Sequence, residues 1–192
     1  MSESDSVPPT AQMLDIFQAN HIHFGSAEEA WARAEHLFPL LGWVVAHFPN
    51  PQAFQVCAEW LRLCAARIED ARPAAELFAQ ARSSVHPRQA HIVAGQLGDL
   101  RNQWILEKKP AAAAFADSAS DLAETWAAIT TGESDGETGA WARAKAATRA
   151  MVTAWVEHQG LDSEDSSLRR PAQVALVGLL RQSRDGVGLK ET

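Results

Sequence analysis

Prolines constrain the fold of this chain more than any other feature of its sequence. Five helix-like segments each open on a proline, at Pro51, Pro73, Pro87, Pro110 and Pro171. Proline suits the first turn of a helix, because its missing N–H would have no intrahelical partner there. Four of these segments also carry apolar residues at spacings of three and four, which is typical of a helix with one buried face. The sequence therefore predicts a series of helices, most of which begin at a proline.

The clearest apolar stripe follows Pro51. It consists of Phe54, Cys57, Leu61, Cys64 and Ile68. No alternation of apolar and polar residues persists beyond a few positions, and no Asn-Gly hairpin signal is present. Stripes at heptad spacing favour nearly antiparallel packing of neighbouring helices. We therefore expect an all-α fold, a compact bundle or short stack of about seven to eight antiparallel helices with no sheet.

The 192 residues and their 46% hydrophobic content suit a single domain with a substantial core. We expect residues 1–9 to be disordered, residues 10–183 to form one helical domain, and residues 184–192 to be a flexible tail. Ser26 stands three residues before Glu29, the spacing of a capping box. This box predicts a helix that runs to Phe38 and is broken or kinked by Pro39.

The charge and the apolar runs limit the classes of partner. The formal net charge is −7, whereas nucleic acid and anionic membranes require a basic surface. The acidic N-terminal residues include no apolar segment of the secretory type. The longest apolar run, Leu37 to Phe48, is far shorter than the ~20 residues of a membrane span. We therefore expect no membrane span and a cytoplasmic location.

The two cysteines indicate a core position rather than a disulfide. Cys57 and Cys64 lie seven residues apart on one stripe, roughly 10 Å along a helix axis. That separation exceeds the reach of a disulfide. We expect two small, buried, free thiols, which is consistent with a reducing compartment.

One stretch suggests a known family. Ala74, Phe78, Ala81 and Pro87 follow the order of small, bulky, small and proline residues in the second helix of a repeat, and Leu61 suits its first helix. Residues 51–87 thereby resemble one tetratricopeptide-type repeat, although the proline comes slightly late and no second unit is in register. The resemblance implies a helical scaffold that grips a peptide or another protein. It transfers no catalytic residue.

The sequence contains no recognisable catalytic, cofactor-binding or metal-binding motif. His21 and His23 stand two residues apart, but no cluster supplies a third metal ligand. No nucleophile elbow, phosphate-binding loop, His-Glu-x-x-His or Cys-x-x-Cys pattern is present. We therefore predict no catalytic residue, no metal ligand and no cofactor.

Seven tryptophans and no tyrosine give the chain its most unusual composition. Most of the tryptophans stand in apolar surroundings, but Trp31 and Trp141 lie among alanines and charged residues within the same pentapeptide, Ala-Trp-Ala-Arg-Ala. Exposed tryptophan and arginine are common at the centre of protein interfaces. We predict Trp31, Arg33, Trp141 and Arg143 as protein-contact residues. The alternative is that both indoles pack against the bundle, and the pentapeptide match itself is short enough to be a coincidence.

Three functional hypotheses follow. The leading one is a non-enzymatic helical module that binds another protein, or a second copy of itself, as an adaptor or assembly component. The first alternative is an enzyme or small-ligand binder with a pocket between helices, for which His36, His47, His91 and Glu59 are candidates. The second alternative is a nucleic-acid-associated regulator that uses the basic C-terminal segment. That segment contains Arg169, Arg170, Arg181, Arg184 and Lys190, which could also dock an acidic partner or pair with nearby acids.

Overall fold

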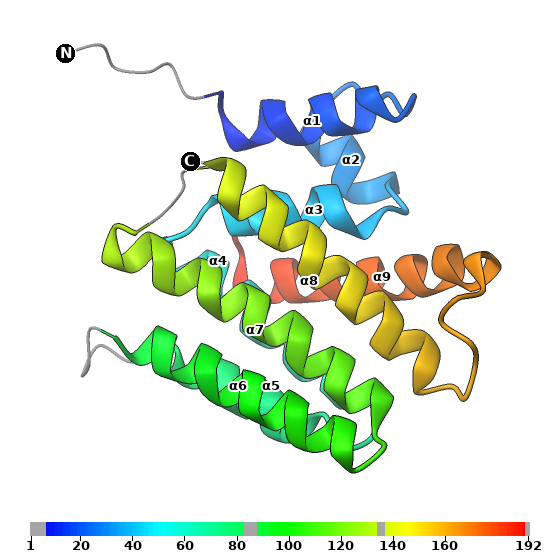
Figure 1. Ribbon diagram of the computed structural model, residues 1–192. Coiled ribbons are helices and arrows are strands. Elements are labelled where there is room, and N and C mark those ends of the chain that lie inside the picture. The colour runs from blue at the N-terminus through cyan, green and yellow to red at the C-terminus, as the bar shows by residue number, and fades with distance from the viewer. Residues whose placement is uncertain (1–6, 83–87, 134–136, 191–192) are drawn as a thin grey trace.

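A computed structural model describes residues 7–82, 88–133 and 137–190, with the side chains of residues 137 and 138 left out (Figure 1). Within these ranges the chain forms nine α-helices, one short 3-10 helix and no strand. The helices are α1 (Pro9–Ala19), α2 (Ala27–Arg33), α3 (Leu37–Ala46), α4 (Pro51–Ala65), α5 (Arg72–Gln80), α6 (Gln89–Leu106), α7 (Pro110–Thr131), α8 (Glu137–Glu157) and α9 (Arg169–Val187). The 3-10 helix is Ser166–Leu168. The all-α, antiparallel prediction is confirmed, with nine helices in place of seven or eight.

Three long helices, α6, α7 and α8, form an antiparallel layer with α7 in the middle (Figure 1). The buried face of α7 is largely alanine, and small side chains allow neighbouring helices to approach closely. Ser118 of α7 donates a hydrogen bond to the Ala147 carbonyl of α8 over 2.8 Å. The buried hydroxyl of Ser118 is thereby satisfied inside the layer.

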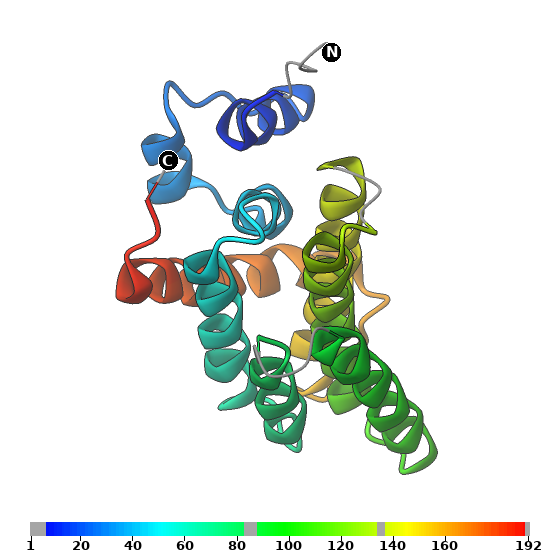
Figure 2. The ribbon, with the colours of Figure 1, turned by 90° about the vertical axis from the view of Figure 1, so that its left-hand side faces the viewer.

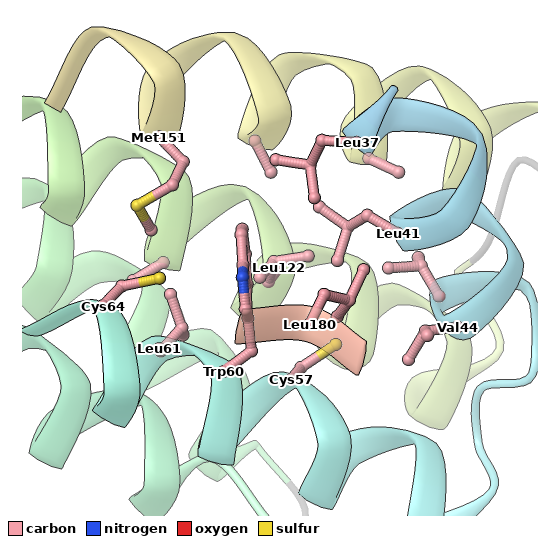
Figure 3. Packing of buried hydrophobic residues seen from close by; sticks show 14 of the residues in the cluster. Leu37, Leu41, Val44, Cys57, Trp60, Leu61, Cys64, Leu122, Met151 and Leu180 are labelled. Carbon is pink, nitrogen blue, oxygen red and sulfur yellow. The ribbon is translucent and has the colours of Figure 1, made fainter. Parts of the chain in front are cut away.

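The core lies where α3, α4, α7, α8 and α9 converge around the indole of Trp60 (Figure 3). Leu122 of α7, Met151 of α8 and Leu180 of α9 are fully buried there. The Trp60 indole N–H donates to the Leu176 carbonyl over 3.2 Å, which ties α4 to α9. Cys57 and Cys64 are free and buried, as predicted, and burial raises the pKa of both thiols.

The structure describes four of the five prolines that were predicted to open helices, and each of the four lies in the first turn of a helix. Pro51 and Pro110 are the first residues of α4 and α7, and Pro73 is the second residue of α5. Pro171 is the third residue of α9, in its first turn. Pro87 lies outside the described residues. Because the first turn needs no N–H donor, each of these four prolines costs its helix no hydrogen bond.

The region around Pro39 differs from the prediction. α2 ends at Arg33, and Pro39 lies in the first turn of α3 instead of interrupting a longer helix. Placing the break before Leu37 lets Pro39 occupy a position where no donor is missing. The Ser26 hydroxyl accepts from the Glu29 amide over 3.1 Å as expected, but the Glu29 carboxylate accepts from the Gly25 amide rather than from Ser26.

The structure also differs from the prediction of a disordered N-terminus and a flexible C-terminal tail. α1 already begins at Pro9, inside the segment expected to be disordered; residues 1–6 are outside the described part. The expected C-terminal tail is helical as far as Val187. Gly188, at φ 75°, ends α9 in a left-handed conformation, and Leu189 is buried. The tail is therefore ordered at least to Leu189 because an apolar side chain beyond the helix packs against the core.

Candidate functional site

The first predicted contact pair lies in α2. Trp31 is only 3% exposed, so the expectation of an exposed indole is wrong. Its ring packs edge-to-face against Trp43 of α3, with 5.4 Å between the ring centroids. Arg33 is exposed and pairs with Glu29 one turn earlier in the same helix. The two residues thus point to different surroundings and do not form one surface.

The second predicted pair lies at the start of α8. Trp141 is 8% exposed and therefore also buried, against expectation. Its ring lies edge-to-face against Phe38 and fills the space above Gly42, where a Cβ atom would stand 2.2 Å from the ring. Arg143 is half-buried, and its charge partly opposes the rise in the pKa of Asp121 on α7 that burial of this carboxyl causes. Both indoles are buried because large apolar rings supply much of the contact area between short helices.

The basic C-terminal segment makes contacts inside the molecule. Arg170 donates to the Glu35 carboxylate over 2.9 Å. Arg181 donates to the backbone carbonyls of Trp31 and Ala34. These contacts run to the α2–α3 connection and not to the neighbouring acids at 162–165. Arg170 and Arg181 of α9 are thus engaged in contacts within the fold, which weakens the case for an acidic partner at these two residues.

A groove of about 1050 Å³ lies over the outer face of α4. The helix α5 borders one side, and the last turns of α9 border another. Much of its lining is small, since alanines from α4, α5 and the turn between them line it together with Gly186 and Val187. The alanines are Ala58, Ala65, Ala66, Ala75 and Ala79. Small residues in such a groove let the backbone or side chains of a partner come close to the helices.

Charged side chains stand in the groove in matched pairs. Arg62 and Glu59 form a two-point ion pair with N–O distances of 2.7 and 2.6 Å. The hydrogen bonds from Arg62 hold the pKa of the Glu59 carboxyl below its usual range, although partial burial opposes this shift. Arg72 lies 3.4 Å from Glu76 on α5. Gln55 and Gln182 add neutral amide groups. The groove therefore carries no net charge from these residues.

The residues considered for chemistry do not assemble into a reactive centre. The His47 Nδ1–H donates to the Trp43 carbonyl over 2.6 Å, and the imidazole of His91 lies 3.2 Å from Glu133. Among the described residues, no group of three or more histidines, cysteines or acids is placed to hold a metal ion. No helix in that part of the chain has the length and apolar character of a membrane span.

The groove was not identified from the sequence. A signal for it is present, because Ala58 and Ala65 repeat at seven residues on α4 and Ala75 and Ala79 at four on α5. Alanine, however, marks buried and exposed helix faces equally well. Comparisons of the chain with family models, curated proteins and solved structures found no match.

Proposed function

We propose that this protein is a non-enzymatic helical module that binds a segment of another protein, or of a second copy of itself, in the groove of α4, α5 and α9. The observation that carries the proposal is the groove itself, with its alanine lining and its paired charges. From Gln55 to Ala66 the lining of α4 extends roughly 16 Å at 1.5 Å per residue. That length accommodates about three turns of a partner helix.

The chemistry of the groove favours recognition over catalysis. The carboxylate of Glu59 is stabilised in its charged form by Arg62, so it is poorly suited to donate or accept a proton near neutral pH. Arg62 and Arg72 offer planar guanidinium groups beside small apolar residues, a combination that is common in protein interfaces. Because each arginine already has a carboxylate beside it, an anionic occupant such as nucleic acid would meet repulsion as well as attraction.

The proposal also includes a family resemblance and a cellular location. The tetratricopeptide-type resemblance of residues 51–87 remains a prediction; its helices would be α4 and α5, which border the groove. The free, buried thiols of Cys57 and Cys64 suit a reducing compartment, so we place the protein in the cytoplasm.

Site-specific photocrosslinking in the source cell tests the proposal. A photoreactive residue in place of Ala58 should give one discrete adduct, whose partner mass spectrometry identifies. The control is the same residue in place of Gln96, which is exposed on α6 away from the groove. A second substitution, Ala79→Trp, should fill the groove and abolish the adduct. No adduct from position 58, an equal adduct from position 96, or an adduct that survives Ala79→Trp would contradict the proposal.

A further inference from the structure

The helix α2 depends on other elements for its stability. It has seven residues, too few to persist alone in water. Its principal helical neighbour is α1, and α1 and α2 lie together at one end of the molecule (Figure 2). Ala32, Arg33, Glu35 and His36 are exposed. The opposite face carries Ala27, Ala30, Trp31 and Ala34, which are buried, so this short segment is held by a few side chains and by contacts from other elements rather than by a long helical interface.

Arg181 of α9 supplies the missing contacts at the end of α2. Its Nη2 group donates to the Ala34 carbonyl over 2.6 Å, and its Nε–H donates to the Trp31 carbonyl. The last carbonyls of a helix have no intrahelical partner, so one guanidinium from a distant helix satisfies two of them. Hydrogen bonds from a charged donor are among the stronger ones in proteins.

The neighbouring turns of α9 reinforce this contact. The guanidinium of Arg184 lies 4.6 Å from the Trp31 ring centroid and 5.4 Å from that of Trp43. The side-chain carbonyl of Gln173 accepts from the Leu37 amide over 3.2 Å. Arg170 pairs with Glu35, as described above. Four side chains of α9 thus contact residues in or next to the segment 31–37.

We propose that residues 27–36 form a strap that opens as a local unit while the rest of the bundle stays folded, and that Arg181 holds it closed. Opening the strap breaks the two Arg181 contacts and removes Trp31 from the face of Trp43. Two large aromatic surfaces that are hidden in the closed state then become accessible. The strap is a conformational switch that controls an aromatic surface, independent of the groove and of the function proposed for it.

Thiol labelling of the full chain tests this inference with an internal control. The only native thiols, Cys57 and Cys64, are fully buried in α4 and report global unfolding. Ala30→Cys adds a thiol at a fully buried position of α2. We expect the added thiol to react with a chromogenic disulfide at least tenfold faster than Cys57 and Cys64. Arg181→Gln should accelerate labelling of the added thiol about tenfold further and leave Cys57 and Cys64 within twofold.

The matched control for Arg181→Gln is Arg169→Gln, an exposed arginine at the start of the same helix, which should change no labelling rate. Hydrogen exchange of the chain without the added thiol provides a second measurement. Amides of 28–36 should exchange faster in Arg181→Gln, while those of 115–127 in α7 keep their rates. If the added thiol reacts only as fast as Cys57 and Cys64, or if α2 and α7 lose protection together, the strap does not open locally and the inference is wrong.

Discussion

The pentapeptide Ala-Trp-Ala-Arg-Ala occurs twice in this protein and has two different structural outcomes. At Ala30–Ala34 it forms the last turn of the seven-residue helix α2, and Ala34 is already extended, with ψ 141°. At Ala140–Ala144 it lies near the beginning of α8, which continues to Glu157. Both copies bury their tryptophan, and in both the indole N–H is buried with no hydrogen-bond partner. Identical local sequence thus gives the same burial but a different extent of helix.

The residues that follow each copy explain this difference. Five residues after Ala34 comes Pro39, which would lose a hydrogen bond and clash with the preceding turn inside a continuous helix. The chain therefore breaks at residues 34–36 and restarts with Pro39 in the first turn of α3. No proline follows Ala144 before the end of α8. The extent of the helix is set downstream of the pentapeptide, and Arg181 then satisfies the carbonyls that the break leaves exposed.

Replacing each tryptophan with alanine should reveal the largest difference in stability between the two copies of the pentapeptide. Trp141→Ala removes a ring wedged between α3 and α8 and should lower the global free energy of unfolding by about 3–5 kcal/mol. Trp31→Ala should cost less globally, because its loss cannot exceed the free energy of opening the strap. Urea denaturation followed by far-UV circular dichroism measures both. Equal global losses would mean that α2 unfolds only with the whole bundle.

A single added methyl group should affect the second copy alone. Gly42→Ala places a Cβ atom 2.2 Å from the Trp141 ring and should destabilise the protein by about 1–3 kcal/mol through overpacking. Gly178→Ala on α9 is the matched control. Nothing lies within 4 Å of its added Cβ, so it should stabilise by about 0.5–1 kcal/mol through helix propensity. Thermal or urea unfolding checks both, and a neutral Gly42→Ala would show that the Trp141 ring moves freely.

Arg143, the arginine of the second copy, affects the pKa of the Asp121 carboxyl. Burial, together with the charges of Asp117 and Glu124, raises the pKa of Asp121 to about 6, and Arg143 partly opposes this shift. Because the pKa of Asp121 is higher in the folded than in the unfolded state, protonation of this carboxyl favours the folded state. Asp121 therefore stabilises the protein fully below about pH 4 and loses this contribution as the pH rises through about 6.

Asp121→Asn should accordingly stabilise the protein at pH 8 by about 1–2 kcal/mol after allowance for solvent screening, and should have little effect at pH 4. Urea denaturation at the two pH values measures the difference. Asp99→Asn, at an exposed position of α6, is the control and should change the free energy of unfolding by less than about 0.5 kcal/mol. A stabilisation by Asp121→Asn that is equal at both pH values would rule out the raised pKa as its cause.

The sequence was informative about helices and much less so about surfaces. Prolines and apolar stripes predicted the helix starts at Pro51 and Pro110 and the buried cysteines, because these features depend on local backbone chemistry. They could not tell that Trp31 and Trp141 are buried. In the sequence each tryptophan stands beside alanines and an arginine rather than beside large apolar residues, and the contacts that bury the two rings come from distant elements such as α3 and α9. The groove depends likewise on the relative placement of α4, α5 and α9, which no spacing within one helix encodes.

The smallest effect is expected at the arginine of the first copy. The Arg33 side chain is 71% exposed and pairs with Glu29 on its own helix, so Arg33→Ala should change the free energy of unfolding by about 0.5 kcal/mol or less. It should also leave labelling of the Ala30→Cys thiol within twofold, whereas Arg181→Gln accelerates it. Urea denaturation and the labelling assay test this pair together. Both variants remove one cationic group from the same region, so they form a matched pair. If Arg33→Ala opened the strap as readily as Arg181→Gln, the closed position of α2 would depend on the Arg33–Glu29 ion pair rather than on α9.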